Sequence, residues 1–487
     1  MSRRWTRIYL AAAAALALAA CADMKGIDPQ AKLTDAAALG LQDKQNPLAP
    51  AADWWTALGD AQLNRLVAQA LEGNPSLRAA AARVVKAQSA IGMARADERP
   101  QLNGELDAQR MQFQKNYIYP PPYGGSQFNF GTLQLNGSWE LDFFGKHSGA
   151  IAAAVGQARA AEAERDAARV LLAANVARAY VQWARVEDQR AVAELTLVQR
   201  QQMLQLVHER LRAGLDTQLE VRENETGRAD SRTQITALTQ QADAARNALA
   251  ALLGQPRLAA DVAAPRLAAF KPLALPTELY ADWLGRRADI VAARWRVEAA
   301  KGSVQVAKSE FYPNINLVGA IGLQSLGFND WLKSGSLEWN AGPAIRLPIF
   351  DGGRLRANLR GQTADLDAAV ETYNATVIDA MREAADQAQA VESLAIQREQ
   401  QGQALTAAEG AYAIAGNRYR AGLTGYLNVL VTETAVLGQR RQQVDLLAQS
   451  LNAQIGLAQA MGGGWQPTAE EGAPPVAVAE DAASAAP

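Results

Sequence analysis

The sequence of 487 residues contains one cysteine and two histidines, His147 and His208, which lie far apart in the chain. A single cysteine excludes a framework of disulfides within the chain. Two distant histidines leave little material for a histidine-based metal site. The formal net charge of -2 gives no strong attraction to nucleic acid. Since the sequence also lacks a nucleophile–base constellation and a phosphate-binding loop, it predicts no enzyme, no cofactor and no metal site.

Long hydrophobic runs are absent as well. The only candidate is Ile8–Ala20, which follows Arg3, Arg4 and Arg7 and is too short to span a bilayer, since a membrane helix needs about 20 residues. A basic region followed by a short apolar run is typical of a signal peptide, here residues 1–20. If the mature chain crosses a membrane, it must therefore do so with strands.

One segment of the chain occurs twice, at residues 210–226 and 418–434. In each copy, cationic residues precede Gly214 or Gly422, which stand where the end of a helix requires positive φ. A new apolar pattern begins a few residues later, so each copy predicts the tip of a helical hairpin. No glycine or proline occurs between Gly156 and Gly214, which favours one long helix. The identical pairs are Arg210/Arg418, Arg212/Arg420, Ala213/Ala421, Gly214/Gly422, Leu215/Leu423, Leu219/Leu427, Val221/Val429, Glu225/Glu433 and Thr226/Thr434.

Alternation of apolar and polar residues replaces the helical period after Pro100 and after Pro313. It predicts four strands of about ten residues, arranged as two hairpins at about residues 101–145 and 314–351. A half-buried soluble sheet would show the same alternation. Two features favour a transmembrane sheet instead. The strands are long enough for a tilted bilayer crossing, and their polar face carries charges that suit a wet lumen. The charged residues are Glu140, Asp142, Glu338 and Arg346.

These patterns divide the chain into consecutive segments. We expect a signal peptide (1–20), a lipid-anchored N-terminal arm (21–60), a first repeat (61–254), a connecting segment (255–276), a second repeat (277–462) and a disordered C-terminal tail (463–487). Each repeat contains a strand hairpin followed by a helical hairpin, at about 148–253 in the first repeat and 354–461 in the second.

Several short motifs in this order carry a resemblance to a known family. Leu18-Ala19-Ala20-Cys21 resembles a bacterial lipobox, in which the cysteine becomes the lipid-modified N-terminus of the mature protein. The others are Asp53-Trp54-Trp55, Asn74-Pro75, Pro100 and Pro313, Leu347-Pro-Ile-Phe-Asp-Gly-Gly353 and the paired Arg-Ala-Gly-Leu tips. Together they resemble the TolC-type outer-membrane efflux family, in particular its NodT-like lipoprotein branch that serves RND pumps. The resemblance covers residues 21–465.

The resemblance implies an α+β membrane protein built from a duplicated half. Each half contributes its strand hairpin to a trimeric 12-strand transmembrane β-barrel and its coiled-coil helical hairpin to a periplasmic α-barrel. The strand count agrees with a trimer, because four strands cannot close a barrel and eight leave an interior filled by side chains. The implied location is the outer membrane, with a lipid anchor at Cys21 and a periplasmic extension.

The implied function is that of an outer-membrane channel of a tripartite efflux pump, which passively conducts small molecules to the exterior. The implied partners are two further copies of the chain, a periplasmic adaptor protein, an inner-membrane RND-type pump and outer-membrane lipid. A channel for type I protein secretion, which shares the fold, is the alternative; relatives of that kind usually lack a lipobox. A coiled-coil lipoprotein without a channel would not need the strands.

The resemblance also implies roles for particular residues. Gly214-Leu215 and Gly422-Leu423 match the tip positions that contact the adaptor. Leu427 matches an apolar ring at the closed mouth of the channel. Val431 stands where the family pattern has an acidic residue and lies one helical turn beyond Leu427. The sequence therefore predicts a hydrophobic gate formed by Leu427 and Val431 rather than a cation-binding ring.

Overall fold

The computed structural model describes residues 24–34, 51–259, 261–274 and 285–465. The predicted signal peptide, Cys21 and nearly all of the predicted C-terminal tail lie outside these residues. The chain forms two compact units, and each contains residues from both sequence repeats. The first unit is Met1–Leu33, Arg83–Ala161 and Ala293–Tyr373, and the second is Thr34–Ala82, Glu162–Ala292 and Asn374–Pro487.

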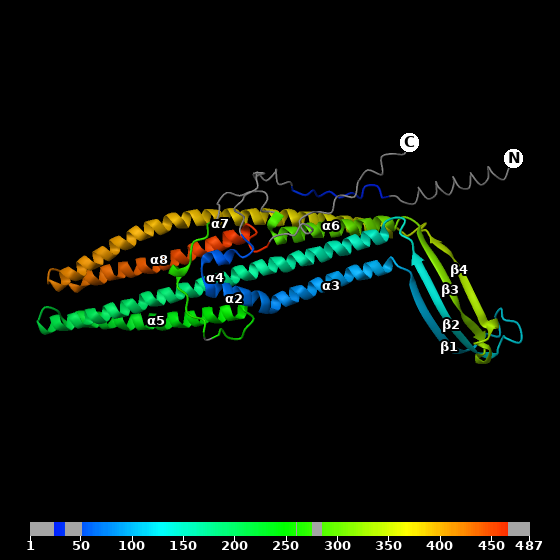
Figure 1. The fold of residues 1–487 in the computed structure, drawn as a ribbon, viewed down its shortest axis with the longest axis horizontal. Coiled ribbons are helices and arrows are strands. Elements are labelled where there is room, and N and C mark those ends of the chain that lie inside the picture. Colours follow the sequence, from blue (N-terminus) through cyan, green and yellow to red (C-terminus); the bar gives the residue numbers. More distant parts are fainter. Residues whose placement is uncertain (1–23, 35–50, 260, 275–284, 466–487) are drawn as a thin grey trace, which may run out of the picture. The chain divides into compact units, whose positions relative to one another are not determined.

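Long helices make up most of the described chain, and the strands lie where alternation predicts them (Figure 1). In chain order, the elements are the 3-10 helix η2 (Trp54–Leu58), α2 (Ala61–Gly73), α3 (Pro75–Asp97), β1 (Gln101–Gln112), β2 (Gln127–Glu140), α4 (Lys146–Arg212), α5 (Gln218–Leu252), the 3-10 helix η3 (Leu267–Ala269), α6 (Ala288–Ser309), β3 (Asn314–Leu326), the 3-10 helices η5 (Phe328–Asp330) and η6 (Ser334–Ser336), β4 (Leu337–Arg346), α7 (Arg354–Arg420) and α8 (Tyr426–Ala460).

The two longest helices, α4 and α7, each contain 67 residues. The carboxylate of Asp142 accepts hydrogen bonds from the backbone N–H groups of Lys146 and Ser148, at 2.7 and 2.8 Å. It satisfies donors that a helix start leaves unpaired, so α4 begins at Lys146, slightly before the expected Ser148. Within the described residues, no helix is both long enough and apolar enough to cross a membrane.

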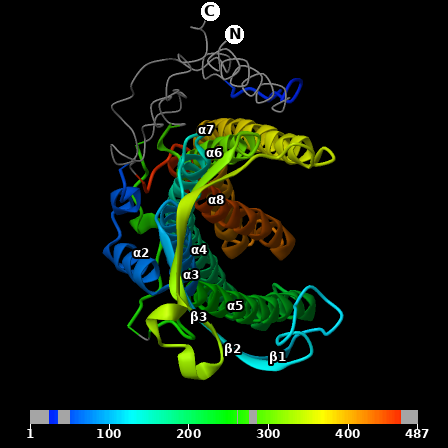
Figure 2. The same ribbon diagram turned by 90° about the vertical axis from the view of Figure 1, so that its right-hand side faces the viewer.

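The four strands form one antiparallel sheet in the order β1-β2-β3-β4, and β2 pairs with β3 to join the two predicted hairpins. The loops that connect β1 to β2 and β3 to β4 lie at the same end of the sheet (Figure 2). The register places apolar and polar rows on opposite faces. One row contains Leu106, Leu133, Leu323 and Leu337, and the adjacent row on the other face contains Glu105, Gln134, Gly322 and Glu338.

The first unit has its own small apolar core. Ile27 from the N-terminal arm packs with Val297 and Val304 of α6 and with Leu355 and Leu359 of α7. Helices α4 and α6 approach closely at glycines: a Cβ on Gly156 would lie 2.7 Å from the backbone nitrogen of Ala299, and one on Gly302 would lie 2.6 Å from that of Ala153. These helices therefore pack with their backbones nearly in contact.

The second unit contains the larger core, in which Trp54, Tyr180 and Trp183 are almost completely buried. The polar atoms of Trp183 and Tyr180 find partners, as most buried polar groups do, whereas the indole nitrogen of Trp54 is buried without one. The indole nitrogen of Trp183 donates to Glu187 at 3.0 Å, and the hydroxyl of Tyr180 accepts from Gln62 at 2.8 Å. The paired tryptophans of the Asp53-Trp54-Trp55 motif thus begin the packed part of this unit.

Candidate functional site

The two predicted tips are helix ends of the same type (Figure 1). Gly214 and Gly422 have φ of 72° and 74°, the left-handed region that favours glycine. The N–H of Gly214 donates to the carbonyl of Leu211, and the N–H of Leu215 donates to that of Arg210; the second tip repeats both hydrogen bonds. This pattern is the Schellman motif, which satisfies the last carbonyl groups of a helix.

The leucines that follow these glycines are exposed. The Schellman motif often places this residue against an apolar side chain five positions earlier, but here those positions hold Arg210 and Arg418. Leu215 is 63% exposed and Leu423 is 70% exposed. Each tip therefore presents an apolar side chain to its surroundings next to cationic residues.

At the first tip, a polar cluster joins the two helical hairpins. Arg210 donates to both carboxylate oxygens of Asp216, at 3.0 and 3.2 Å, and to the backbone carbonyl of Tyr419 at 3.0 Å. Its guanidinium carbon lies 4.5 Å from the centre of the Tyr419 ring, and the Tyr419 hydroxyl donates to Asp216. Burial, with the neighbouring Asp216 carboxylate, raises the pKa of Tyr419. The tyrosine hydroxyl thus remains a donor at neutral pH.

A second buried cluster joins three helices beyond the tips. Arg200 of α4 makes two contacts with the Glu433 carboxylate of α8, at 3.1 and 3.2 Å, and it also donates to the carbonyl of Gly227 and to Ser231 of α5. The Glu433 side chain is only 7% exposed. Because a buried carboxylate needs a compensating charge, Arg200 fixes the relative positions of α4, α5 and α8.

The predicted gate residues occupy the opposite side of α8. Leu427 is 66% exposed and Val431 is 61% exposed, whereas Val429 and Glu433 are buried. Glu433 is therefore turned away from Val431, because two residues along a helix are separated by about 200°. The first repeat places Leu219, which is 61% exposed, at the position of Leu427, and it places Glu223 at the position of Val431.

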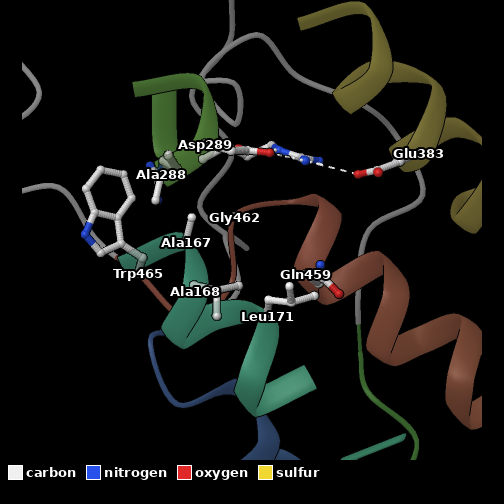
Figure 3. A pocket seen from close by; sticks show the side chains of 12 residues that line it. Ala167, Ala168, Leu171, Ala288, Asp289, Glu383, Gln459, Gly462 and Trp465 are labelled. Carbon is white, nitrogen blue, oxygen red and sulfur yellow. Dashed lines mark hydrogen bonds and ion pairs between the residues drawn. The ribbon is translucent and has the colours of Figure 1, made fainter. Parts of the chain in front are cut away.

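Sequence reasoning missed both polar clusters and a pocket in the second unit (Figure 3). The pocket has a volume of about 390 Å³, and Trp465 lies at one side of it beside Ala167 and Ala288. Arg287 contacts Asp289 at 2.7 Å and Glu383 at 3.0 Å. Although burial opposes the charged form, these two carboxylates raise the pKa of Arg287. The pocket wall is therefore neutralised by its own ion pairs.

The remaining predictions concern lipid and metal. Cys21, the predicted lipidation site, lies outside the described residues. Among the residues that are described, no group of three or more histidine, cysteine or acidic side chains is placed to hold a metal ion.

An exposed amphipathic sheet and two helical hairpins define the α+β fold of an outer-membrane channel protein. The crystal structure of the outer membrane protein VceC from Vibrio cholerae matches with a TM-score of 0.80 and 35% identity, covering 86% of this chain and 100% of that one. The fusaric acid resistance protein FusA of Burkholderia cepacia is 40% identical over 364 residues, 72% of this chain and 68% of that protein. The pyoverdine export outer membrane protein OpmQ of Pseudomonas aeruginosa is 32% identical over 416 residues, 85% and 87% of the two chains.

The family model described as outer membrane efflux protein matches residues 66–255 and 279–463. The chain therefore belongs to this family, and its function is that of the outer-membrane channel component of an efflux pump. The predicted family, fold class and outer-membrane location are confirmed.

Proposed function

We propose that three copies of this chain assemble into a passive exit duct with a 12-strand transmembrane barrel. The observation that supports this proposal is that the four-strand sheet does not close on itself and has two unpaired edges. Both β1 and β4 are edge strands within the chain, and nearly all residues of the sheet are exposed or only half-buried. Unpaired strand edges are not tolerated in lipid, so further copies must pair with them. Three copies are the smallest number that leaves an open lumen.

The experiment for this proposal is native mass spectrometry of the protein in detergent, combined with conductance in planar bilayers. The expected result is a trimer that forms discrete ion-conducting channels. A stable monomer or dimer would contradict the proposed architecture, and a trimer without conductance would contradict the duct.

We also propose that the tips receive a periplasmic adaptor protein, which links the duct to an inner-membrane pump of the RND type. The support is the exposure of Leu215 and Leu423 at rigid helix ends, where an apolar side chain has no core to enter. Clustered exposed apolar residues are typical of interaction sites. Since both leucines follow the same Schellman motif, the tips present the same local shape twice.

The double variant Leu215→Asp/Leu423→Asp tests the tips. Two desolvated carboxylates in an apolar contact are costly, so efflux-dependent growth should be lost while the amount of folded trimer stays unchanged. The matched control is Leu332→Asp, because Leu332 is 78% exposed and lies in the loop between β3 and β4, which belongs to the other unit. Normal efflux in the double variant would contradict the proposed adaptor contact.

We propose further that the resting channel is closed by Leu427 and Val431. Each subunit would contribute two apolar side chains from consecutive turns of one helix face. Three such faces that converge at the tips would exclude water without a bound ion, because apolar constrictions close by dewetting. The direction of Glu433 supports this arrangement, since its carboxylate is bound by Arg200 and is turned away from that face.

The variant Leu427→Ser/Val431→Ser should raise single-channel conductance and sensitise cells to large antibiotics. Leu219→Ser, at the equivalent position of the first repeat, is the matched control and should leave both measurements near the wild-type values. Tight block of the wild type by millimolar divalent cations from the periplasmic side would show that acidic residues form the constriction instead.

A further inference from the structure

The sheet has two free edges, and its internal hydrogen bonds fix which backbone groups point outward from each edge. The N–H of Leu141 donates to the carbonyl of Ile315, so odd-numbered residues of β2 and β3 are joined by hydrogen bonds. The residues of a strand bond alternately to its two neighbours. The odd-numbered residues of β4 and the even-numbered residues of β1 therefore direct their backbone groups away from the sheet, toward a neighbouring copy.

We call the contact between β4 of one copy and β1 of the next copy the seam. One row of paired residues crosses the sheet through Gln101, Ser138, Val318 and Gly342. The seam shift is the number of residues beyond Gln101 at which this row would meet β1 of the next copy. Outward-pointing groups oppose each other only when the shift is even. Even shifts also keep the apolar side chains on one face of the barrel.

The lengths of the two edge strands limit the shift further. Strand β4 has 10 residues and β1 has 12. A shift below four leaves Arg346 beyond the first residue of β1, Gln101, and a shift above six leaves Leu337 beyond its last residue, Gln112. Because unpaired backbone groups are costly in lipid, the even shift is four or six.

The tilt of membrane strands gives the same limit independently. The tangent of the tilt scales with the shear divided by the number of strands, and eight strands with a shear of 8 tilt by about 36°. Three equal seams in a 12-strand barrel give a shear of three times the shift. Shifts of four, six and eight then correspond to tilts of roughly 36°, 47° and 55°. Since strands in a bilayer tilt by about 35–45°, a shift of eight is excluded.

The charges on the lumen face distinguish the two remaining shifts. With a shift of four, Glu338 would face Gln109 of the partner subunit and lie diagonal to the partner's Asp107. Two carboxylates at such positions repel each other. With a shift of six, Glu338 faces the partner's Met111 instead and has no acid beside it across the seam.

A shift of six also gives Arg346 a partner. Among the described residues of its own chain, Arg346 makes no hydrogen bond or ion pair. At this shift it faces Asn103 of the partner subunit and lies diagonal to the partner's Glu105, at about 7–8 Å, which long side chains can bridge. Within its own chain, one carboxylate oxygen of Glu105 accepts from Asn136 at 3.3 Å, so the other oxygen is available.

We propose that three seams with a shift of six residues close the barrel, and that an ion pair between Arg346 and the partner's Glu105 holds each seam on its lumen side. The inference rests on the proposed trimer and specifies how its copies join. The seam also sets the width of the duct, because a barrel widens as its strands tilt. The width between opposite backbones is about 27 Å at this shift and about 23 Å at a shift of four.

Disulfide cross-linking measures the shift directly, because Cys21 is the only native cysteine. Asn340→Cys is combined in turn with Asp107→Cys, Gln109→Cys and Met111→Cys, which correspond to shifts of four, six and eight. The thiols face the lumen, where copper phenanthroline in the membrane suspension oxidises them. Directly opposite positions have Cα atoms about 4.5 Å apart and can form a disulfide, whereas positions displaced by two residues are about 8 Å apart and cannot.

Asn340→Cys/Gln109→Cys should give disulfide-linked dimers and trimers, and the other two pairs should give little above the wild-type background. The matched control is Gln109→Cys/Phe130→Cys, which joins β1 to β2 within one chain and should give an oxidised monomer only. Stronger cross-linking through Asp107→Cys or Met111→Cys would overturn the proposed shift.

Charge reversal tests the ion pair. Arg346→Glu should weaken the trimer by about thirtyfold, because a loss of about threefold at each seam multiplies over three seams. Arg346→Glu/Glu105→Arg should recover most of this loss, measured as the trimer fraction in native mass spectra of diluted protein. Lys333→Glu is the matched control, since Lys333 is 67% exposed and pairs with Asp330 in the loop between β3 and β4. It should leave the trimer unchanged.

Two results separate failure of the seam from failure of the duct. A trimer that cross-links at a different position, or whose charge reversal is not rescued by the double variant, overturns the proposed seam and leaves the duct intact. A protein that gives no trimer in native mass spectra and no intermolecular disulfide with any of the three pairs contradicts the duct, and the seam fails with it.

Discussion

Removal of the Arg200 charge should loosen the attachment of α8 to α4 and α5. In Arg200→Met, the stem of the side chain keeps most of its apolar volume, but Glu433 loses both hydrogen bonds of its ion pair. The two side chains are 15% and 7% exposed, so solvent cannot replace the lost partner. Removing one partner of a buried ion pair costs about 3–5 kcal/mol. Even the lower figure corresponds to a change of about a hundredfold in a local opening equilibrium.

Hydrogen–deuterium exchange is a suitable measurement, because unfolding of a membrane oligomer is often irreversible whereas local opening is read directly from amide protection. The amides in the first part of α8 (Tyr426–Ala460) should exchange about a hundredfold faster in Arg200→Met. The control is Arg222→Met on α5. Arg222 is 76% exposed and pairs with Glu225 at 2.8 Å, and exposed pairs contribute about 0–1 kcal/mol. Its effect on exchange should be severalfold at most.

The double variant Arg200→Met/Glu433→Leu separates charge from packing. An apolar pair of similar volume is often neutral or stabilising in place of a buried ion pair, so protection should largely return. The coupling of the two substitutions follows from the double-mutant cycle. The reasoning is refuted if Arg200→Met changes exchange no more than Arg222→Met, or if the effects of the two single substitutions simply add.

Two other predictions concern packing and lipid attachment. Gly302→Ala should destabilise the protein by about 1–3 kcal/mol through overpacking, because its Cβ would lie 2.6 Å from the backbone nitrogen of Ala153. Gly361→Ala should instead stabilise the protein by about 0.5–1 kcal/mol, because a Cβ on Gly361 of α7 would have no atom within 4 Å. The temperatures at which the two variants lose their structure in detergent, each compared with the wild type, measure these effects. The mature chain should begin at Cys21 and carry acyl chains, which intact mass of the membrane-extracted protein measures directly. A mature chain with a free thiol or a different first residue would contradict this.

The sequence was sufficient to predict the long helices, the strands and the hairpin tips, because these depend on local signals. Gly214 and Gly422 mark helix ends that require positive φ, and alternation marks strands whose two faces differ. The shared helix face of Leu427 and Val431 followed from the angle per residue alone. Each of these inferences used residues that are close together in the chain, so no knowledge of packing was needed.

The polar clusters could not be predicted in the same way. Arg200 and Glu433, like Arg210 and Tyr419, are separated by more than two hundred positions, and their contact depends on how one hairpin is shifted along the other. Nothing in the local sequence fixes that shift. Glu225 and Glu433 are identical members of the repeat, yet Glu433 is buried against Arg200 while Glu225 is only half-buried beside Arg222. The identity of the two repeats therefore did not show that Glu433, and not Glu225, is the glutamate that forms the buried ion pair.

The two tips have the same backbone conformation but differ in how their return helices begin. This difference gives the two helices different mechanical roles. Thr217 and Glu220 form a capping box at the start of α5, so this helix holds its own first turn. The start of α8 has Gly425 as its N-cap and no side-chain cap. It is held instead by Tyr426, whose hydroxyl accepts from the buried Asn224 at 2.8 Å. The helix that carries Leu427 and Val431 is therefore positioned by contacts with the first hairpin, and a movement between the hairpins acts directly on these two residues.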